Sequence, residues 1–236
     1  RALGPENVRC VLMPSQFSSD HSVNDARQLA ENLGTQYDII PIAEIYGSFE
    51  QALKPHFWGQ PFGLAEENIQ SRARGILLMA LSNKYGPILL NTTNKSEMAV
   101  GYGTLYGDLC GGLSVIGDVY KTDVYHLAEY MNREEEVIPR HILTKPPSAE
   151  LRPDQKDTDS LPEYDELDPI LHQYIEERMG PDEIIAQGHS EVLVRRILRL
   201  VNINEFKRYQ SAPVLRVSPK AFGMGRRMPI VGKYLS

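Results

Sequence analysis

The chain is 236 residues long, carries a formal net charge of −6 at pH 7 and is 42% hydrophobic. This length suits one doubly wound α/β domain with at most a small appendage, and the acidic balance argues against a nucleic-acid-binding surface. No stretch approaches the ~18 consecutive apolar residues of a membrane span, and no signal peptide opens the chain. Two cysteines provide no disulfide framework. We therefore expect a cytoplasmic enzyme or binding domain.

The N-terminal segment predicts a strand, a helix and a second strand. Val8–Met13 and Tyr37–Ile42 have the composition of strands. Between them, apolar residues recur at helical spacing from a candidate N-cap at Ser22 up to Gly34. This order predicts a βαβ unit, and therefore a parallel sheet with right-handed crossovers.

Two further helices and a third strand are predicted before residue 91. Phe49–Leu53 is a short helix, and Ala65–Lys84 is a long amphipathic helix. The apolar stripe of the long helix consists of Ile69, Ala73, Ile76, Leu77, Ala80 and Leu81. The apolar run Gly86–Leu90 is too short for a helix and predicts a buried strand.

The second half predicts more helices and one long loop. Helices are expected over Lys95–Tyr102, from Asp118 onward, near Leu167–Arg178 and near Ser190–Asn204. Glycines between residues 101 and 112 let backbone amides approach a ligand closely. The polar, proline-rich segment 141–166 is expected to be a loop, of a length typical of lids or disordered segments.

The turn after the third predicted strand contains the candidate ligand-binding side chains. Thr92 and Thr93 offer hydroxyl groups, and Glu97 follows in the first turn of the next helix. Ligands of open α/β sheets bind beyond the carboxyl ends of the strands. Hydroxyl groups with one hard anion suit phosphate and a divalent cation.

Each of these features also has a purely structural interpretation. Threonines after a strand commonly form turns, and a glutamate in a first helical turn commonly caps the helix. Lys121 opposes the dipole at a helix start, which hints at a ligand. The histidines show no metal-ligand spacing. Taken singly, the features predict only a nucleotide-binding α/β domain.

Several motifs in order resemble the synthetase domain of NAD synthetase, in its glutamine-dependent branch. The resemblance runs from Leu3 to Pro229. It is carried by Leu12-Met-Pro-Ser15, Glu67-Asn-Ile-Gln-Ser-Arg-Ala-Arg-Gly75, Asn94-Lys-Ser-Glu-Met-Ala-Val-Gly-Tyr-Gly-Thr-Leu-Tyr-Gly-Asp108, Lys145-Pro-Pro-Ser-Ala-Glu-Leu151, Phe206-Lys-Arg208 and Arg216-Val-Ser-Pro-Lys-Ala-Phe-Gly223. It implies a three-layer α/β/α fold of the adenine-nucleotide alpha-hydrolase (ATP-pyrophosphatase) type.

The resemblance also implies a reaction and a set of ligand-binding residues. The family joins ammonia to the nicotinate carboxylate of deamido-NAD, using ATP and Mg²⁺ and releasing AMP and pyrophosphate. By resemblance, Glu97 binds magnesium and lies against deamido-NAD, and no side chain need act as a covalent nucleophile. The remaining implied residues are Thr92, Lys121 and Ser148 for ATP, and Asn68, Arg72, Asp108 and Lys207 for deamido-NAD. The loop over residues 145–160 is an expected water-excluding lid.

Two departures from the family pattern qualify the resemblance. The phosphate loop Ser-Gly-Gly-x-Asp-Ser is absent, so we expect residues 1–236 to be one domain lacking its first strand, this loop and most of the first helix. Leu105 stands where the ammonia-dependent branch has a lysine. This favours the glutamine-dependent branch, in which an upstream amidase domain supplies ammonia. The family also implies a homo-oligomer.

Three alternative functions remain open at this stage. The first is another ligase of the ATP-pyrophosphatase class, such as a GMP synthetase or a tRNA-modifying ligase, although the acidic charge counts against tRNA. The second is a non-catalytic nucleotide-binding fragment. The third is a structural domain that contributes mainly a subunit interface.

From the missing phosphate loop we predict that the 236-residue chain by itself is inactive. The backbone amides of that loop cradle pyrophosphate in the family, and its aspartate is the partner of Glu97 on magnesium. The purified chain is assayed with deamido-NAD, ATP and ammonia, beside a version extended upstream through the loop. Normal turnover by the shorter chain would refute the prediction.

Overall fold

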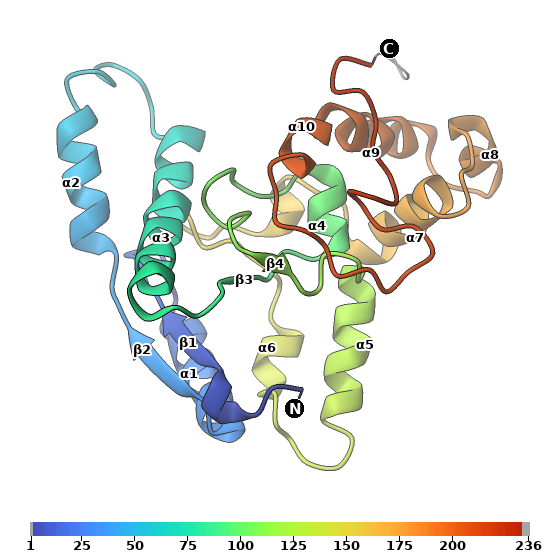
Figure 1. Cartoon of the computed structure of the whole chain (residues 1–236). Coiled ribbons are helices and arrows are strands. Elements are labelled where there is room, and N and C mark those ends of the chain that lie inside the picture. Colours follow the sequence, from blue (N-terminus) through green and yellow to red (C-terminus); the bar gives the residue numbers. More distant parts are fainter. Residues whose placement is uncertain (1, 233–236) are drawn as a thin grey trace. The chain divides into compact units, whose positions relative to one another are not determined.

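The structure is a computed structural model that describes residues 2–232. It divides into two compact units. The first unit comprises Arg1–Leu78 with Tyr125–Ser160, and the second comprises Met79–Val124 with Leu161–Ser236. Figure 1 labels their helices and strands. Within residues 2–232, none of the helices combines the length and apolar character that a membrane crossing requires.

The predicted βαβ motif forms the start of the first unit, after a short 3₁₀ turn, η1 (Pro5–Asn7). Strands β1 (Arg9–Leu12) and β2 (Gln36–Ile39) pair in parallel, and helix α1 (Asp20–Leu33) connects them. The parallel pairing confirms the predicted motif.

Helix α1 begins earlier than predicted, because its N-cap is Ser19 rather than Ser22. Ser19 has extended backbone angles, and its hydroxyl oxygen accepts a hydrogen bond from the Ser22 N–H at 3.1 Å. Ser22 therefore lies inside the first turn. The helix ends at Gly34, whose left-handed conformation with φ of 66° suits glycine.

Helices α2 (Ala43–Leu53) and α3 (Leu64–Tyr85) follow, and α2 is longer than predicted. The predicted apolar stripe of α3 is only partly confirmed, because Ala73 is buried but Ile76 is 59% exposed, and Gln70, outside the stripe, is fully buried. The side-chain nitrogen of Gln70 donates a hydrogen bond to the Leu151 carbonyl at 2.8 Å, which compensates for the burial of that nitrogen. The small residues Ser71, Ala73 and Gly75 of the same helix are also buried.

The loop predicted over residues 141–166 is partly helical. Helix α6 (Arg140–Thr144) occupies its start, a short 3₁₀ turn η2 (Asp157–Asp159) lies within it, and α7 begins at Tyr164. The intervening segment is ordered by side-chain contacts, because the Glu150 carboxylate accepts hydrogen bonds from the hydroxyl groups of Ser19 and Ser22. Its role as a lid stays a prediction.

The second unit contains a short parallel strand pair, β3 (Leu90–Asn91) and β4 (Leu113–Ser114). A parallel bridge from Ser114 to Val214 extends the pair. The predicted buried strand 86–90 is wrong for most of its length, since Ile88 is 64% exposed. The paired region starts only at Leu90, because β4 is two residues long and begins opposite it. The α/β class with parallel strands and connecting helices is confirmed.

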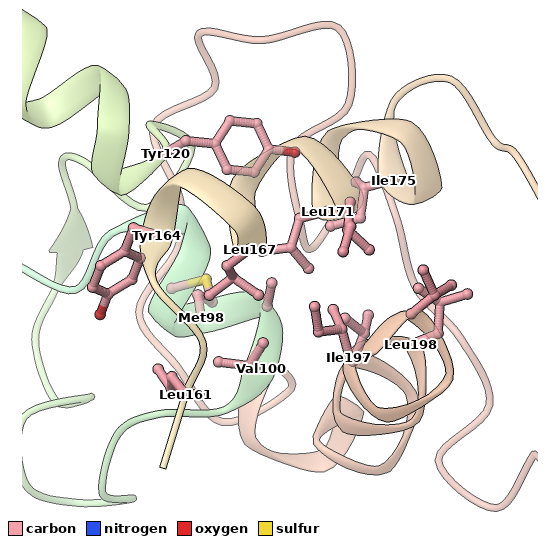
Figure 2. Packing of buried hydrophobic residues seen from close by; sticks show 14 of the residues in the cluster. Met98, Val100, Tyr120, Leu161, Tyr164, Leu167, Leu171, Ile175, Ile197 and Leu198 are labelled. Atoms are coloured by element: carbon pink, nitrogen blue, oxygen red, sulfur yellow. The ribbon is translucent and has the colours of Figure 1, made fainter. Parts of the chain in front are cut away.

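Helices build the core of the second unit. They are α4 (Lys95–Val100), α7 (Tyr164–Ile175), α8 (Pro181–Ala186), α9 (Glu191–Ile203) and α10 (Glu205–Arg208). Helix α5 (Lys121–Met131) begins in the second unit, and its residues from Tyr125 onward belong to the first. Figure 2 shows apolar side chains of α4, α7 and α9 converging, among them Met98, Leu167 and Ile197. The short helices α8 and α10 are absent from the sequence-based prediction.

A buried lysine connects four segments of the second unit. The Lys95 ammonium lies 2.9 Å from the Asp118 carboxylate and 2.8 Å from the Glu176 carboxylate, and it donates to the Ser218 hydroxyl group at 2.9 Å. The side chains of Lys95 and Asp118 are fully buried. The network therefore joins α4, the segment before α5, the end of α7 and the C-terminal segment.

Helix α5 begins three residues later than predicted, and Asp118 lies in the segment before it. Its carboxylate is bonded to Lys95 and accepts hydrogen bonds from the N–H groups of Val217 and Ser218, at 2.8 and 2.6 Å. Burial by itself raises the pKa of Asp118, but these bonds outweigh it and hold the pKa below its usual value.

We predict that Asp118→Asn lowers the free energy of unfolding at neutral pH by about 3 kcal/mol, because it breaks a buried ion pair. A carboxyl whose pKa is lowered by folding stabilises the protein above its unfolded pKa of about 3.9, and this stabilisation is lost as the pH falls. The variant should therefore show a shallower loss of stability below about pH 4. Urea unfolding at a series of pH values measures both effects. Glu135→Gln, on an exposed residue, is the control and should leave both unchanged.

Candidate functional site

The ligand-binding residues implied by the sequence fall into two groups. The first group lies in the first unit, on α3 and in the loop before α7. The second group lies in the second unit, on α4 and the turns and helices bonded to it. The members are Asn68, Arg72 and Ser148 in the first group, and Thr92, Glu97, Asp108, Lys121 and Lys207 in the second.

Glu97 is oriented by the N-terminal cap of α4. The Asn94 side-chain oxygen accepts from the Glu97 N–H at 3.0 Å, and the Glu97 carboxylate accepts from the Asn94 N–H at 3.1 Å. This reciprocal pair is a capping box. A carboxylate has two oxygens and about four lone-pair sites, so capping does not exhaust the capacity of Glu97 to bind a cation.

Asn91 holds the hydroxyl-bearing turn. It is buried, and its side-chain oxygen accepts from the Thr93 N–H at 3.0 Å and from the Ser114 hydroxyl at 3.1 Å. Its amide nitrogen donates to the carbonyls of Asp108 and Cys110, at 2.6 and 3.2 Å. Thr92 is left exposed beside the loop that carries Asp108. Sequence analysis missed Asn91, although a polar residue directly after an apolar run is a signal for such a role.

Asp108 and Lys207 are neighbours around the glycine-rich segment. The Asp108 carboxylate accepts from the Thr104 N–H at 2.8 Å, and a Cβ atom at Gly103 would lie only 2.9 Å from its other oxygen. The Lys207 ammonium donates to the carbonyls of Gly101 and Gly103, at 2.6 and 2.8 Å. Burial lowers the pKa of Lys207, while the charge of Asp108 opposes this shift.

The C-terminal end of α4 is capped by α10 and the residue before it. Asn204 donates to the Val100 carbonyl at 2.9 Å, and Arg208 donates to the Ala99 carbonyl at 2.7 Å. Glu205 pairs with Arg208 at 2.7 Å, so the buried guanidinium is neutralised. These contacts fix α10 against α4 and thereby position Lys207.

Lys121 is the first residue of α5 and is half-buried. Its N–H donates to the Ser96 hydroxyl oxygen at 2.9 Å. Its ammonium lies 5.7 Å from the centroid of the Tyr164 ring, within cation–π range. Because Ser96 precedes Glu97 on α4, Lys121 and Glu97 lie on directly bonded segments.

The first group is held together by contacts between α3 and the loop. Asn68 and Arg72 lie one helical turn apart on α3. The loop that carries Ser148 is joined to the same helix by the bond from Gln70 to Leu151 described above. The Ser148 hydroxyl oxygen accepts from the Glu150 N–H at 3.0 Å, which tightens the turn.

A protein-only metal cage is not seen in residues 2–232, which hold no group of three or more His, Cys, Asp or Glu side chains able to bind a metal ion. Magnesium commonly takes one or two carboxylates and completes its coordination with substrate phosphates and water. A single carboxylate at Glu97 beside hydroxyl groups fits such a site.

Comparison with known proteins decides the family. The profile of the NAD synthase family matches residues 1–211. The chain belongs to the NAD synthase family. Similar members are the glutamine-dependent NAD⁺ synthetase of Synechocystis, 58% identical over 97% of this chain and 41% of that protein, and that of Thermotoga maritima, 50% identical over 99% of this chain and 41% of that protein. The chain spans about two fifths of the length of such relatives.

Solved structures of a glutamine-dependent NAD⁺ synthetase and of an NMN synthetase share the fold. The ADP complex of the glutamine-dependent NAD⁺ synthetase from Acinetobacter baumannii is 46% identical, with a TM-score of 0.61 over 97% of this chain and 41% of that chain. The NMN synthetase from Francisella tularensis is 26% identical, with a TM-score of 0.70 over 89% of this chain and 78% of that chain. These neighbours confirm the expected ATP-pyrophosphatase fold.

We predict that Asn91→Ala lowers the free energy of unfolding by about 3 kcal/mol, because buried donors and acceptors lose their partner. The amide of Thr93 should also exchange faster with solvent, since it loses its acceptor. Chemical unfolding and hydrogen exchange measure the two effects. Asn83→Ala, at an exposed position near the end of α3, is the control. An equal, small effect of both substitutions would contradict the role of Asn91.

Proposed function

We propose that the protein catalyses the ATP-dependent amidation of deamido-NAD to NAD. The observation that carries the proposal is the family match over residues 1–211. The geometry supports it, because α4 and the segments bonded to it bring together the residues of the second group. Their hydroxyl, carboxylate and ammonium groups suit a nucleotide with phosphates and a divalent cation.

The proposed reaction has two steps. A carboxylate oxygen of the nicotinate group attacks the α-phosphorus of ATP, a P–O bond to the departing pyrophosphate breaks, and an acyl-adenylate forms. Ammonia then attacks the acyl carbon, the C–O bond to AMP breaks, and a proton leaves the nitrogen to complete the amide. The first step makes a poor electrophile reactive, and it requires neutralisation of the developing pyrophosphate charge.

The residues of both groups have proposed roles in this reaction. Lys121 supplies positive charge to the ATP phosphates, and the hydroxyl groups of Thr92 and Ser148 donate hydrogen bonds to them. Glu97 binds magnesium and contacts deamido-NAD, whose binding is completed by Asn68, Arg72, Asp108 and Lys207. ATP as the nucleotide is supported by the ADP in the Acinetobacter baumannii structure.

Magnesium is part of the proposal because the donor set fits it. Glu97 is the residue that would hold the ion, together with phosphate oxygens of the nucleotide. When bound, the ion supplies charge neutralisation at the phosphates. The chain itself contributes the fixed carboxylate through the capping box of α4.

The ammonia source is also proposed from relatives. Proteins named glutamine-dependent NAD⁺ synthetase are 45–58% identical to the chain. Their names support glutamine as the donor of ammonia in the intact protein. A homo-oligomeric state and a cytoplasmic location remain predictions from the sequence.

A second candidate substrate is nicotinate mononucleotide, favoured by the similarity to the NMN synthetase from Francisella tularensis. The full-length protein is assayed with ATP, Mg²⁺ and ammonia or glutamine, and with deamido-NAD, nicotinate mononucleotide or XMP in separate reactions. Preferred amidation of deamido-NAD supports the main proposal. Preference for the mononucleotide or for XMP would replace it, and ATP binding without pyrophosphate release would indicate a non-catalytic nucleotide-binding module.

We predict that Glu97→Gln in the full-length protein raises the Mg²⁺ concentration for half-maximal NAD formation at least about tenfold, because a bound cation loses a charged ligand. Glutamine preserves the hydrogen bond to the Asn94 N–H, so the thermal stability should change little. Magnesium titrations of the rate and melting curves test both parts. Glu191→Gln, in the first turn of α9, is the matched control. An unchanged Mg²⁺ requirement would contradict the role of Glu97.

A further inference from the structure

The start of α5 is capped by side chains from two other helices. The Lys121 N–H donates to the Ser96 hydroxyl oxygen at 2.9 Å, and this hydroxyl donates to the Asp168 carboxylate at 2.5 Å. The N–H and the hydroxyl group of Thr122 both donate to the other oxygen of Asp168, at 2.9 Å each. Two of the N–H groups that a helix leaves unpaired at its start are therefore satisfied from α4 and α7.

Both residues of this capping pair, Ser96 and Asp168, are buried. Ser96 is fully buried and Asp168 is 4% exposed. On α7, Asp168 follows Leu167 directly and lies two residues before Ile170, and both are fully buried core residues. A carboxylate in such surroundings is stable only when its oxygens accept hydrogen bonds, so the three bonds donated to it fix its position.

This cap acts on the residue that opposes the helix dipole. A lysine at a helix N-terminus is disfavoured by the partial positive charge there. The buried carboxylate of Asp168 offsets that charge from within the protein. Ser96 links Lys121 to Glu97, because it is joined to Glu97 by a peptide bond and accepts a hydrogen bond from the backbone N–H of Lys121.

We propose that Ser96 and Asp168 are positioning residues, which hold Lys121 in register with Glu97 for binding the ATP phosphates. In this proposal neither residue contacts ATP. The proposal rests on the proposed function. The Ser96 hydroxyl group bonds both to Asp168 and to the backbone N–H of Lys121, whereas the Thr122 hydroxyl group bonds to the same carboxylate but not to the Lys121 N–H. The two hydroxyl groups therefore provide a matched pair for a test.

The test compares Ser96→Ala with Thr122→Val in the full-length protein. Each substitution removes one hydroxyl group from Asp168, but only Ser96→Ala also removes the acceptor of the Lys121 N–H. Ser96→Ala should lower kcat/KM for ATP about tenfold, and the KM for deamido-NAD should stay within about twofold. Thr122→Val should change kcat/KM for ATP less than about twofold.

A double-mutant cycle with Lys121→Met separates positioning from general destabilisation. If Ser96 acts through Lys121, Ser96→Ala has no further effect on kcat/KM for ATP once the ammonium group is gone. A merely structural role would reduce activity equally in both backgrounds. Should Ser96→Ala not fold, Ser96→Cys replaces it, because a thiol is a weaker donor and acceptor of similar shape.

The outcomes distinguish this inference from the function on which it rests. A wild-type protein that forms no NAD overturns both. A wild-type protein that forms NAD overturns the positioning role alone if Ser96→Ala behaves like Thr122→Val, or if its effect persists in the Lys121→Met background. A selective loss toward ATP that vanishes in that background supports the positioning role.

Discussion

The second unit depends on the capping of one six-residue helix, α4. A helix this short leaves most of its terminal backbone groups without intrahelical partners, so it is stable only if other segments supply them. Asn94 and Glu97 satisfy its start, and the side chains around α10 satisfy its carbonyl groups. Each of these contacts also orients a residue of the proposed site. Stability and ligand-binding geometry therefore share the same hydrogen bonds.

Buried charges give this arrangement its specificity. Lys95, Asp168 and Arg208 are each buried and each hydrogen-bonded to partners from distant segments. A buried charged side chain is stable in the protein only when all its hydrogen-bonding and ion-pair partners are in place. Such groups contribute modest net stability, but any shift of α4 relative to α7 or the C-terminal segment leaves one of them unpaired. The proposed phosphate-binding groups are thereby held in a defined arrangement within the unit.

Local sequence patterns predicted helices and strands well where apolar periodicity alone determined the structure. The βαβ motif and the amphipathic α9 follow from apolar periodicity, and the left-handed Gly34 ends α1 as expected. The exposed face of α3 was not predictable in this way, because the bond from Gln70 to a distant carbonyl decides which side is buried. The prediction of a strand near residue 88 was wrong for a related reason. Hydrophobicity alone does not supply a strand with a pairing partner.

The sequence by itself determined the family and the identities of the candidate ligand-binding residues. It did so because its motifs resemble those of NAD synthetases in order and in spacing along the chain. It also indicated Lys121, through its conflict with the helix dipole. The tertiary structure decided how those residues are held. Asn91, Ser96, Asp168 and Asn204 have bonding partners that are distant in the chain, and their roles appear only when folding brings buried donors and acceptors within hydrogen-bond distance.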